Sequence, residues 1–451
     1  MGAQSSKRPV ADEAGAQRSQ YGFATAIAVV IANMIGTGVF TSLGFQLVQI
    51  QSGFAILALW TVGGVAALCG AMSYAELGAA LPRSGGEYNF LTRIYHPAAG
   101  FVSGWVSATI GFAAPVALAA ITFAAYATSV VDEGGAYWRQ QALAIALIIV
   151  MAGIHGGRRG ASGAMQKIFT LIKLLVIIAF CSAAVFVLKT PQPISFMPSS
   201  ADVGVITSGA FAVSLIYVSF AYAGWNAATY LSGEIENPQN YLPRILTLGT
   251  LIVMLAYIAL NAVFLKAAPI EDMVGKVEIG FIAAKALFGK TGADLTGLVM
   301  ASLLISTVSA MTIAGPRVLQ MIGQDFAAFA RLARVNRDGI PSMAIYFQSA
   351  IAIVFIITSS FDFILVFAGF TLALNTFFTV LGVYVLRWRE PKLARPYKTF
   401  GYPFTPLVFL ALTGWTLTYV LIQRPVEGLF GLALIVGGVL FYVVAKSVRG
   451  N

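Results

Sequence analysis

Charged residues are scarce in this chain of 451 residues: Asp, Glu, Lys and Arg make up 10% of it, against 58% hydrophobic residues. Soluble domains carry about 25% charged residues, so the composition excludes an ordinary soluble protein. Apolar stretches long enough for a helix to cross a bilayer, about 20 residues each, recur along nearly the whole sequence. A transmembrane β-barrel would instead show short segments of alternating hydrophobicity. The sequence therefore predicts an all-α polytopic membrane protein.

Cysteine and histidine, which supply many catalytic and metal sites, are almost absent. Cys69 and Cys181 both fall within apolar stretches and form no C-x-x-C pair, and the two histidines have no partner for a metal or catalytic site. The sequence also has no P-loop, which argues against ATP-driven transport. We therefore expect no enzyme and no cofactor or metal. A membrane-embedded enzyme and a channel or receptor remain as rival classes.

Twelve spans account for the apolar stretches. Placed in this way, they put most of the 28 lysines and arginines on the side of the N-terminus. The positive-inside rule then predicts cytoplasmic termini in the cell inner (plasma) membrane. The net charge of +10 follows this topology, and we expect no nucleic acid partner. The expected spans are 21–48, 53–81, 98–130, 140–156, 163–188, 205–231, 243–266, 293–323, 342–359, 362–387, 403–422 and 426–446.

The chain reads as one integral membrane domain. Residues 1–20 are small and polar and indicate a disordered cytoplasmic tail, and residues 21–451 form the single integral membrane unit. The longest polar segment between spans, 266–292, contains a helical apolar stripe and predicts a short amphipathic helix on the outer face. The basic, proline-rich connector 387–406 is expected to lie at anionic headgroups on the inner face.

Two spans are interrupted by small residues. The first breaks at Ile35-Gly36-Thr37-Gly38 and the sixth around residues 219–224. Glycine inside a helix costs about 1 kcal/mol relative to alanine, so these positions require an explanation. The two spans begin successive groups of five and run in opposite directions. Interruptions at matching positions of two inverted halves point to a transporter binding site. The alternative is close packing of small residues between helices.

The broken helices would expose both poles of the backbone halfway through the bilayer. Unpaired backbone groups are tolerated there only inside protein or beside a cavity. The half-helix that restarts near Gly38 offers N–H groups and the positive end of its dipole, which suit a carboxylate. Free carbonyls, which suit an ammonium, are expected at Met34, Ile35, Phe220, Ala221 and Ala223. This combination fits the backbone end of an α-amino acid.

Five segments resemble one family of transporters. They are MIGTGVF (34–40), AMSYAELGAALPRSGGEYNFL (71–91), IFTLIKLL (168–175), FAYAGWNAATYLSGEIENPQNYLPR (220–244) and RPYKTFGYP (395–403). The chain resembles the amino acid–polyamine–organocation (APC) superfamily, closest to its L-type amino acid transporters and their bacterial relatives. The resemblance implies the leucine-transporter-type fold of 12 transmembrane helices, a 5+5 inverted repeat (21–188 and 205–387) followed by two C-terminal helices (403–446).

The resemblance also implies roles for residues at the breaks. It puts the substrate carboxylate on Gly36, Thr37 and Gly38, and the amino group on the carbonyls of Met34, Phe220 and Ala223. Phe220 would be the gate that closes over the substrate, and Asn226 would line the sixth-span break. L-type members often have a second glycine at the position of Ala223, so the methyl group here predicts a smaller pocket.

Lys173 falls in the middle of the fifth span. A lysine at that depth costs at least about 2.5–3.5 kcal/mol on insertion scales, so we expect it to have a function. The resemblance places it against the first span, where sodium binds in sodium-driven relatives of the fold, and an ammonium there would replace the ion. It could also carry a proton, because desolvation lowers the pKa of a lysine. The alternative is a side chain that reaches the inner headgroups.

Apart from Lys173, the centres of the substrate-lining spans carry no charge that could pair with a charged side chain. We therefore expect secondary active transport of small-to-medium neutral L-amino acids by alternating access, sodium-independent and through exchange. A proton-coupled amino acid symporter, or a cationic amino acid or polyamine permease, is the alternative. The outer loop 131–141 lacks the cysteine through which animal L-type members bind a heavy chain, so we expect no disulfide-linked partner.

Three acidic residues at span ends have simpler expected roles. Glu76 and Glu87 flank the inner end of the second span and are expected to pair with cytoplasmic arginines, with proton transfer as the alternative. Asp362 begins the tenth span and is expected to cap its helix.

Overall fold

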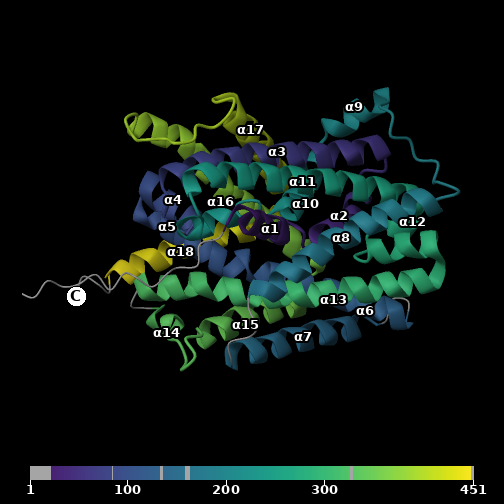
Figure 1. Cartoon of the computed structure of the whole chain (residues 1–451), viewed down its shortest axis with the longest axis horizontal. Coiled ribbons are helices and arrows are strands. Elements are labelled where there is room, and N and C mark those ends of the chain that lie inside the picture. The colour runs from purple at the N-terminus through teal and green to yellow at the C-terminus, as the bar shows by residue number, and fades with distance from the viewer. Residues whose placement is uncertain (1–21, 84, 133–135, 158–162, 326–328, 448–451) are drawn as a thin grey trace, which may run out of the picture.

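The computed structural model describes residues 22–83, 85–132, 136–157, 163–325 and 329–447, and these ranges contain helices and no strand. The long helices run nearly side by side along the longest axis of the molecule (Figure 1). The predicted tail, residues 1–20, lies outside the described residues. The helices are α1 (Phe23–Met34), α2 (Gly38–Gln46), α3 (Gly53–Ala80), α4 (Glu87–Ile94), α5 (Pro97–Val106), the π-helix η1 (Ser107–Gly111), α6 (Ala113–Asp132), α7 (Tyr137–Gly157), α8 (Gly163–Val187), α9 (Ser200–Ile206), α10 (Gly209–Tyr222), the 3-10 helix η2 (Ala227–Glu234), α11 (Pro238–Ala267), α12 (Ile270–Met273), α13 (Ile279–Asp325), α14 (Ala330–Ala333), α15 (Ser342–Thr358), α16 (Phe361–Arg389), α17 (Phe404–Gln423) and α18 (Pro425–Ser447).

Nine helical stretches of the described chain are long and apolar enough to cross a membrane. The helices α9 and α10 form a tenth candidate, as a pair bent by 66°. Two shorter apolar helices, 171–187 and 342–358, fall below that length. The molecule is therefore a multi-pass membrane protein, whereas the count of twelve spans and the inverted repeat remain predictions. The nine stretches are Phe23–Gln46, Gly53–Ala80, Pro97–Val131, Tyr137–Gly157, Pro238–Ala267, Ile279–Gln324, Phe361–Arg389, Phe404–Gln423 and Pro425–Val444.

The two ends of the bundle differ. One end carries α9 and α12, on the right of Figure 1, and the other carries α4 and α14, on the left; we call them the α9 end and the α4 end. The amphipathic helix predicted within 266–292 is present at the α9 end as the start of α13. It is set off from the rest of α13 by Gly289, whose φ of 68° interrupts the helix.

The break in the first span lies where the sequence predicts it. Helix α1 ends at Met34, residues 35–37 are non-helical, and α2 begins at Gly38. The sixth span also breaks within the predicted stretch 219–224, but only at its end, because α10 continues to Tyr222. The chain leaves the helix at Ala223 and turns at Gly224, whose φ of 103° is poorly accessible to other residues. A 3-10 helix, η2, then replaces the second half of the span.

The two breaks pack backbone against backbone. A Cβ atom on Gly38 would lie 2.5 Å from the Cα of Ala221, and one on Gly224 would lie 2.7 Å from the carbonyl oxygen of Asn33. Only glycine permits approaches this close. Gly38 and Gly224 therefore allow close packing between helices, which was the alternative to a binding site. The same contacts hold the two broken spans together.

Three buried aromatic residues lie directly beside the breaks. Trp60, Tyr222 and Tyr257 are each less than 2% exposed and contact one another, with ring centres 5.1–6.0 Å apart. They come from α3, α10 and α11, so one cluster joins three long helices at the level of the breaks. Rings arranged in this way add about 0.5–1.5 kcal/mol per pair beyond the burial of their area.

Candidate functional site

The carbonyl groups at the breaks are partly occupied by a tyrosine. The hydroxyl of Tyr257 donates to the carbonyl of Met34 at 2.6 Å and lies 3.2 Å from the carbonyl of Ala221. The N–H of Gly36 also donates to Met34, at 2.8 Å. One side chain of α11 thus bridges both broken spans: it is a second partner for the Met34 carbonyl and a partner for the Ala221 carbonyl in an apolar interior.

The N–H side of the break lies at the start of α2. Helix starts leave their first N–H groups without intrahelical partners and carry the positive end of the dipole. Thr37, 5% exposed, directly precedes Gly38, and its carbonyl accepts from the N–H of Phe40 and from the hydroxyl of Thr41 at 3.1 Å. Within the described chain, its own hydroxyl makes no hydrogen bond.

The predicted residues of the sixth span separate into two groups. Phe220 and Ala221 lie in the last turn of α10, where the Phe220 carbonyl accepts from the N–H of Ala223 at 3.0 Å. The Phe220 ring is 8% exposed and belongs to an apolar cluster with α16. Asn226 turns away from these residues and donates to the carboxylate of Glu87. The structure therefore brings Met34–Gly38 beside Ala221 but directs the Asn226 side chain toward the α4 end.

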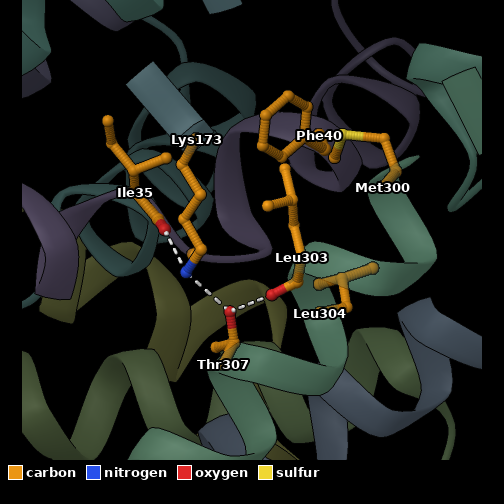
Figure 2. Close-up of a pocket in the computed structure, with 8 residues that line it drawn as sticks. Ile35, Phe40, Lys173, Met300, Leu303, Leu304 and Thr307 are labelled. Atoms are coloured by element: carbon orange, nitrogen blue, oxygen red, sulfur yellow. Dashed lines mark hydrogen bonds between the residues drawn. The ribbon is translucent and has the colours of Figure 1, made fainter. Parts of the chain in front are cut away.

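Lys173 reaches the first-span break. Its ammonium donates to the carbonyl of Ile35 at 3.2 Å and to the hydroxyl of Thr307 at 2.8 Å (Figure 2). Thr307 in turn donates to the carbonyl of Leu303. Among the described residues, no carboxylate pairs with Lys173. The side chain is therefore held by neutral oxygens at the point where α1 stops.

A small pocket adjoins this lysine. It lies between the first-span break, α8 and α13, and it has room for about one water molecule. Figure 2 shows the side chains around it, with the Lys173 ammonium and the Thr307 hydroxyl as the polar groups among apolar neighbours. The volume suits an ion or a water and is too small for an amino acid. It is lined by Ile35, Gly36, Phe40, Lys173, Met300, Leu303, Leu304 and Thr307.

Sequence reasoning missed two residues of this region. Tyr257 stands out only as a single hydroxyl in an apolar span. Thr307 lies in a stretch with several other serines and threonines, 305–312, so nothing in the sequence distinguishes it. Tyr257 on α11 binds the Met34 carbonyl directly, and Thr307 on α13 binds Lys173, which in turn binds the Ile35 carbonyl. Neither helix contains the sequence motif of the break.

The acidic residues at the α4 end behave differently from each other. Glu76, 2% exposed, accepts two hydrogen bonds from Arg387, as expected, and two more from the N–H and hydroxyl of Thr399. For Glu87 the expected arginine pairing is wrong. Among the described residues its partners are Tyr74, Asn226 and Tyr230, which are neutral donors.

The predicted helix cap at Asp362 is also wrong. Ser360 caps α16, accepting from the N–H of Phe363, while Asp362 pairs with Arg424 at 2.5 Å and accepts from Tyr217. Arg424 also pairs with Glu427. Partial burial opposes the charge of Arg424, but its hydrogen bonds to Glu427 and Asp362 outweigh that effect and raise its pKa.

Aromatic rings lie beside this ion pair at the α9 end. The ring of Phe45 on α2 stacks on Tyr217 of α10 and on Phe361 of α16, with centres 6.1 and 5.4 Å apart. These rings join α2, α10 and α16 at the α9 end, and the Asp362–Arg424 pair joins α16 to the junction of α17 and α18.

Comparisons with known proteins agree with this architecture. Residues 21–442 match the amino acid permease family. The chain is 27% identical to the human large neutral amino acids transporter small subunit 2, over 98% of this chain and 83% of the relative. It is 28% identical to the serine/threonine exchanger SteT of Bacillus subtilis (strain 168), over 93% of this chain and 94% of the relative. It is also 26% identical to the mouse Asc-type amino acid transporter 1, over 98% and 84%. The chain belongs to the amino acid permease family, whose members are transporters and not enzymes.

Proposed function

We propose that this protein is a secondary active transporter of small-to-medium neutral L-amino acids that works by alternating access, independently of sodium, through exchange. The observation that carries the proposal is the pair of broken spans. Carbonyl groups at the end of α1 and N–H groups at the start of α2 lie within one turn of each other, against the end of α10. That arrangement offers complementary partners for both charges of an α-amino acid.

The substrate carboxylate would bind Gly36, Thr37 and Gly38, and its ammonium would bind the carbonyls of Met34, Phe220 and Ala223. Because Tyr257 and Gly36 already donate to Met34, an arriving ammonium must share or replace these hydrogen bonds. Phe220 would close over the bound substrate. The close contact of Gly38 with Ala221 describes the site without substrate, and binding would move the two breaks apart.

Sodium independence is supported by Lys173. Its ammonium supplies a fixed positive charge beside the Ile35 carbonyl, in a pocket the size of one water or ion. A sodium ion at the same place would be repelled by that charge.

The proposed preference for small-to-medium substrates rests on the methyl group of Ala223 and on the substrates for which the relatives are named. The human relative is named for large neutral amino acids and the bacterial one for serine and threonine. The methyl group of Ala223 favours the smaller substrates. Among the described residues, no acidic side chain hydrogen-bonds to residues 34–38 or 220–223, and Glu87 is already bound by Tyr74, Asn226 and Tyr230. Cationic amino acids and polyamines would therefore lack a partner there.

We extend the proposal to topology. The nine long stretches, the bent pair and the two shorter helices would form twelve spans, with repeats at 21–188 and 205–387 and two further helices at 403–446. Residues 21–451 would then form one transport domain. The α4 end would face the cytoplasm together with both termini, in the plasma membrane, and the protein would act without a disulfide-linked heavy chain.

Proton symport is the second candidate, and Lys173 is the observation that favours it. Its partners are neutral oxygens, so it could release a proton without leaving a carboxylate unpaired.

Uptake of radiolabelled serine by the purified protein in liposomes tests these functions. Exchange predicts uptake only when neutral amino acid is present inside, with no change on replacing sodium by choline. Symport predicts uptake into empty liposomes that follows an imposed pH gradient. A channel would give flux without internal amino acid or a gradient, and an enzyme would give no uptake.

A further inference from the structure

Glu87 is a buried carboxylate held by three neutral donors. The side chain is 2% exposed and accepts from the hydroxyl of Tyr74 at 3.0 Å, from the amide of Asn226 and from the hydroxyl of Tyr230. A buried carboxylate requires several donors or a cation, and here the donors come from separate parts of the chain. Glu87 is also the first residue of α4, where the positive end of the helix dipole favours a carboxylate.

Two of the three donors belong to the second half of the sixth span. Asn226 directly precedes η2 and Tyr230 lies within it. This half is joined to α10 only through residues 223–226, where Gly224 turns the chain. Tyr74, in contrast, lies in the uninterrupted helix α3. The Glu87 carboxylate therefore links η2, which can move about the break at residues 223–226, to α3 and α4, which have no break.

The backbone beside Glu87 supports the same contact. Gly86, with a φ of 52°, lies so close to Tyr230 that a Cβ atom on it would be 2.8 Å from the ring. Trp225 packs edge-on against Tyr74, with ring centres 4.6 Å apart. Residues 225–230 are thus seated in a surface made by α3 and by the start of α4.

We propose that Glu87 is the latch of the α4 end: it positions η2 against α3 and α4 and keeps the path from the breaks to that side closed. To open this end, Asn226 and Tyr230 must leave the carboxylate together. The inference rests on the proposed alternating access and adds to it the residue that sets the balance between the two open states. Glu87 is a positioning residue and does not contact the substrate.

Accessibility of a cysteine on η2 tests the latch. Thr229 is fully buried between the two donors, so Thr229→Cys reports whether η2 has moved. In this variant Cys69 and Cys181 are replaced by alanine, and a membrane-impermeant thiol reagent is applied to each face of the reconstituted protein in turn. Glu87→Gln keeps the size of the side chain but leaves one acceptor oxygen. Its NH2 group would face either Tyr74 and Asn226, which share Oε1, or Tyr230, which binds Oε2.

The latch predicts that Glu87→Gln raises the labelling rate of the cysteine introduced at position 229 about tenfold from the α4 side and not from the α9 side. In a background with Thr229 intact, it predicts a lower KM for substrate on the α4 side and a higher KM on the other side. Tyr230→Phe, which removes one hydroxyl, should act in the same direction more weakly, and the double variant should resemble Glu87→Gln alone. Tyr230→Phe also tests the proposal if Glu87→Gln fails to fold.

Glu76→Gln is the matched control, because Glu76 is equally buried at the same end but binds Arg387 and Thr399 instead of η2. Unchanged labelling in Glu87→Gln and Tyr230→Phe, or an equal increase in Glu76→Gln, would overturn the latch. Labelling does not depend on transport, so a wild-type protein that takes up no amino acid would count against the proposed function and not against the latch.

Discussion

The ammonium of Lys173 lies 3.2 Å from the carbonyl oxygen of Ile35, so a side chain of α8 holds the point at which the first span loses its helix. Its other partner is the Thr307 hydroxyl on α13. The sequence predicts that Lys173 lies in the middle of a span, where a lysine costs at least about 2.5–3.5 kcal/mol on insertion scales. The hydrogen bond to the Ile35 carbonyl offsets part of that cost and fixes the break to α8.

Lys173→Ala should therefore reduce uptake by at least about tenfold, because the Ile35 carbonyl loses its cationic donor. The measurement is initial uptake in liposomes at several pH values, with the amount of folded protein checked by size-exclusion chromatography. Kinetics that match the wild type at every pH would contradict a coupling or structural role for this lysine.

Thr307→Val should have a smaller effect in the same direction. The change keeps the shape of the side chain and removes one hydrogen bond to a charged group, worth about 1.5–3 kcal/mol. We expect uptake to fall several-fold, and Lys173→Ala combined with Thr307→Val to be no worse than Lys173→Ala alone. Strictly additive losses in this double-mutant cycle would show that the two residues act separately.

Substitution by alanine should have different effects at Gly36 and at Gly38, the two glycines of the first-span break. A Cβ on Gly38 would lie 2.5 Å from the Cα of Ala221, whereas the nearest atom to a Cβ on Gly36 is 4.0 Å away. Gly38→Ala should lower the melting temperature by several degrees and abolish transport, because the breaks can no longer meet. Gly36→Ala should keep the wild-type melting temperature. Equal melting temperatures for the two variants would argue against the close packing of the breaks.

Ala223→Gly should enlarge the substrate site. One methyl group changes discrimination by about 1–3 kcal/mol in an apolar pocket. We expect the ratio of leucine to serine uptake, compared as kcat/KM, to rise about tenfold or more. A ratio that stays constant while both rates change would place Ala223 outside the surface that contacts the substrate side chain.

The ion pairs at the two ends should contribute unequally to stability. Arg424 binds Asp362 and Glu427 and is 26% exposed, whereas Arg93 binds Glu390 and is 52% exposed. Arg424→Gln leaves two carboxylates without their cation and should lower the melting temperature by a few degrees. Arg93→Gln should have little effect, as is usual for exposed pairs. The opposite order, measured by thermal unfolding in detergent, would contradict this account.

The helical class and the first break are predictable from the sequence because both depend on local signals. Long apolar runs define the spans, and Gly36 and Gly38 interrupt one of them. The sequence places the start of the second break too early. The stretch from Ser219 to Tyr222 is compatible with helix, and only the φ of Gly224 fixes the turn, which depends on packing against Asn33.

Side-chain partners between distant segments are harder to predict. The expected roles of Glu87 and Asp362 follow from their positions at helix ends, but their partners include residues 62 to 145 positions away in the chain. Tyr257 and Thr307 carry a single hydroxyl each, and such residues are common in membrane helices. The contact of Lys173 with the first span, in contrast, is predictable, because a lysine in an apolar span needs a polar partner and the resemblance indicates where that partner would be.

The central claim is that backbone groups of two broken spans bind both charges of an amino acid. Competition for radiolabelled serine uptake by alanine analogues tests it most directly. The account predicts that L-alanine competes, while N-acetyl-L-alanine, which lacks the ammonium, and L-alanine methyl ester, which lacks the carboxylate, do not. Competition by either analogue at the concentrations at which L-alanine competes would contradict it.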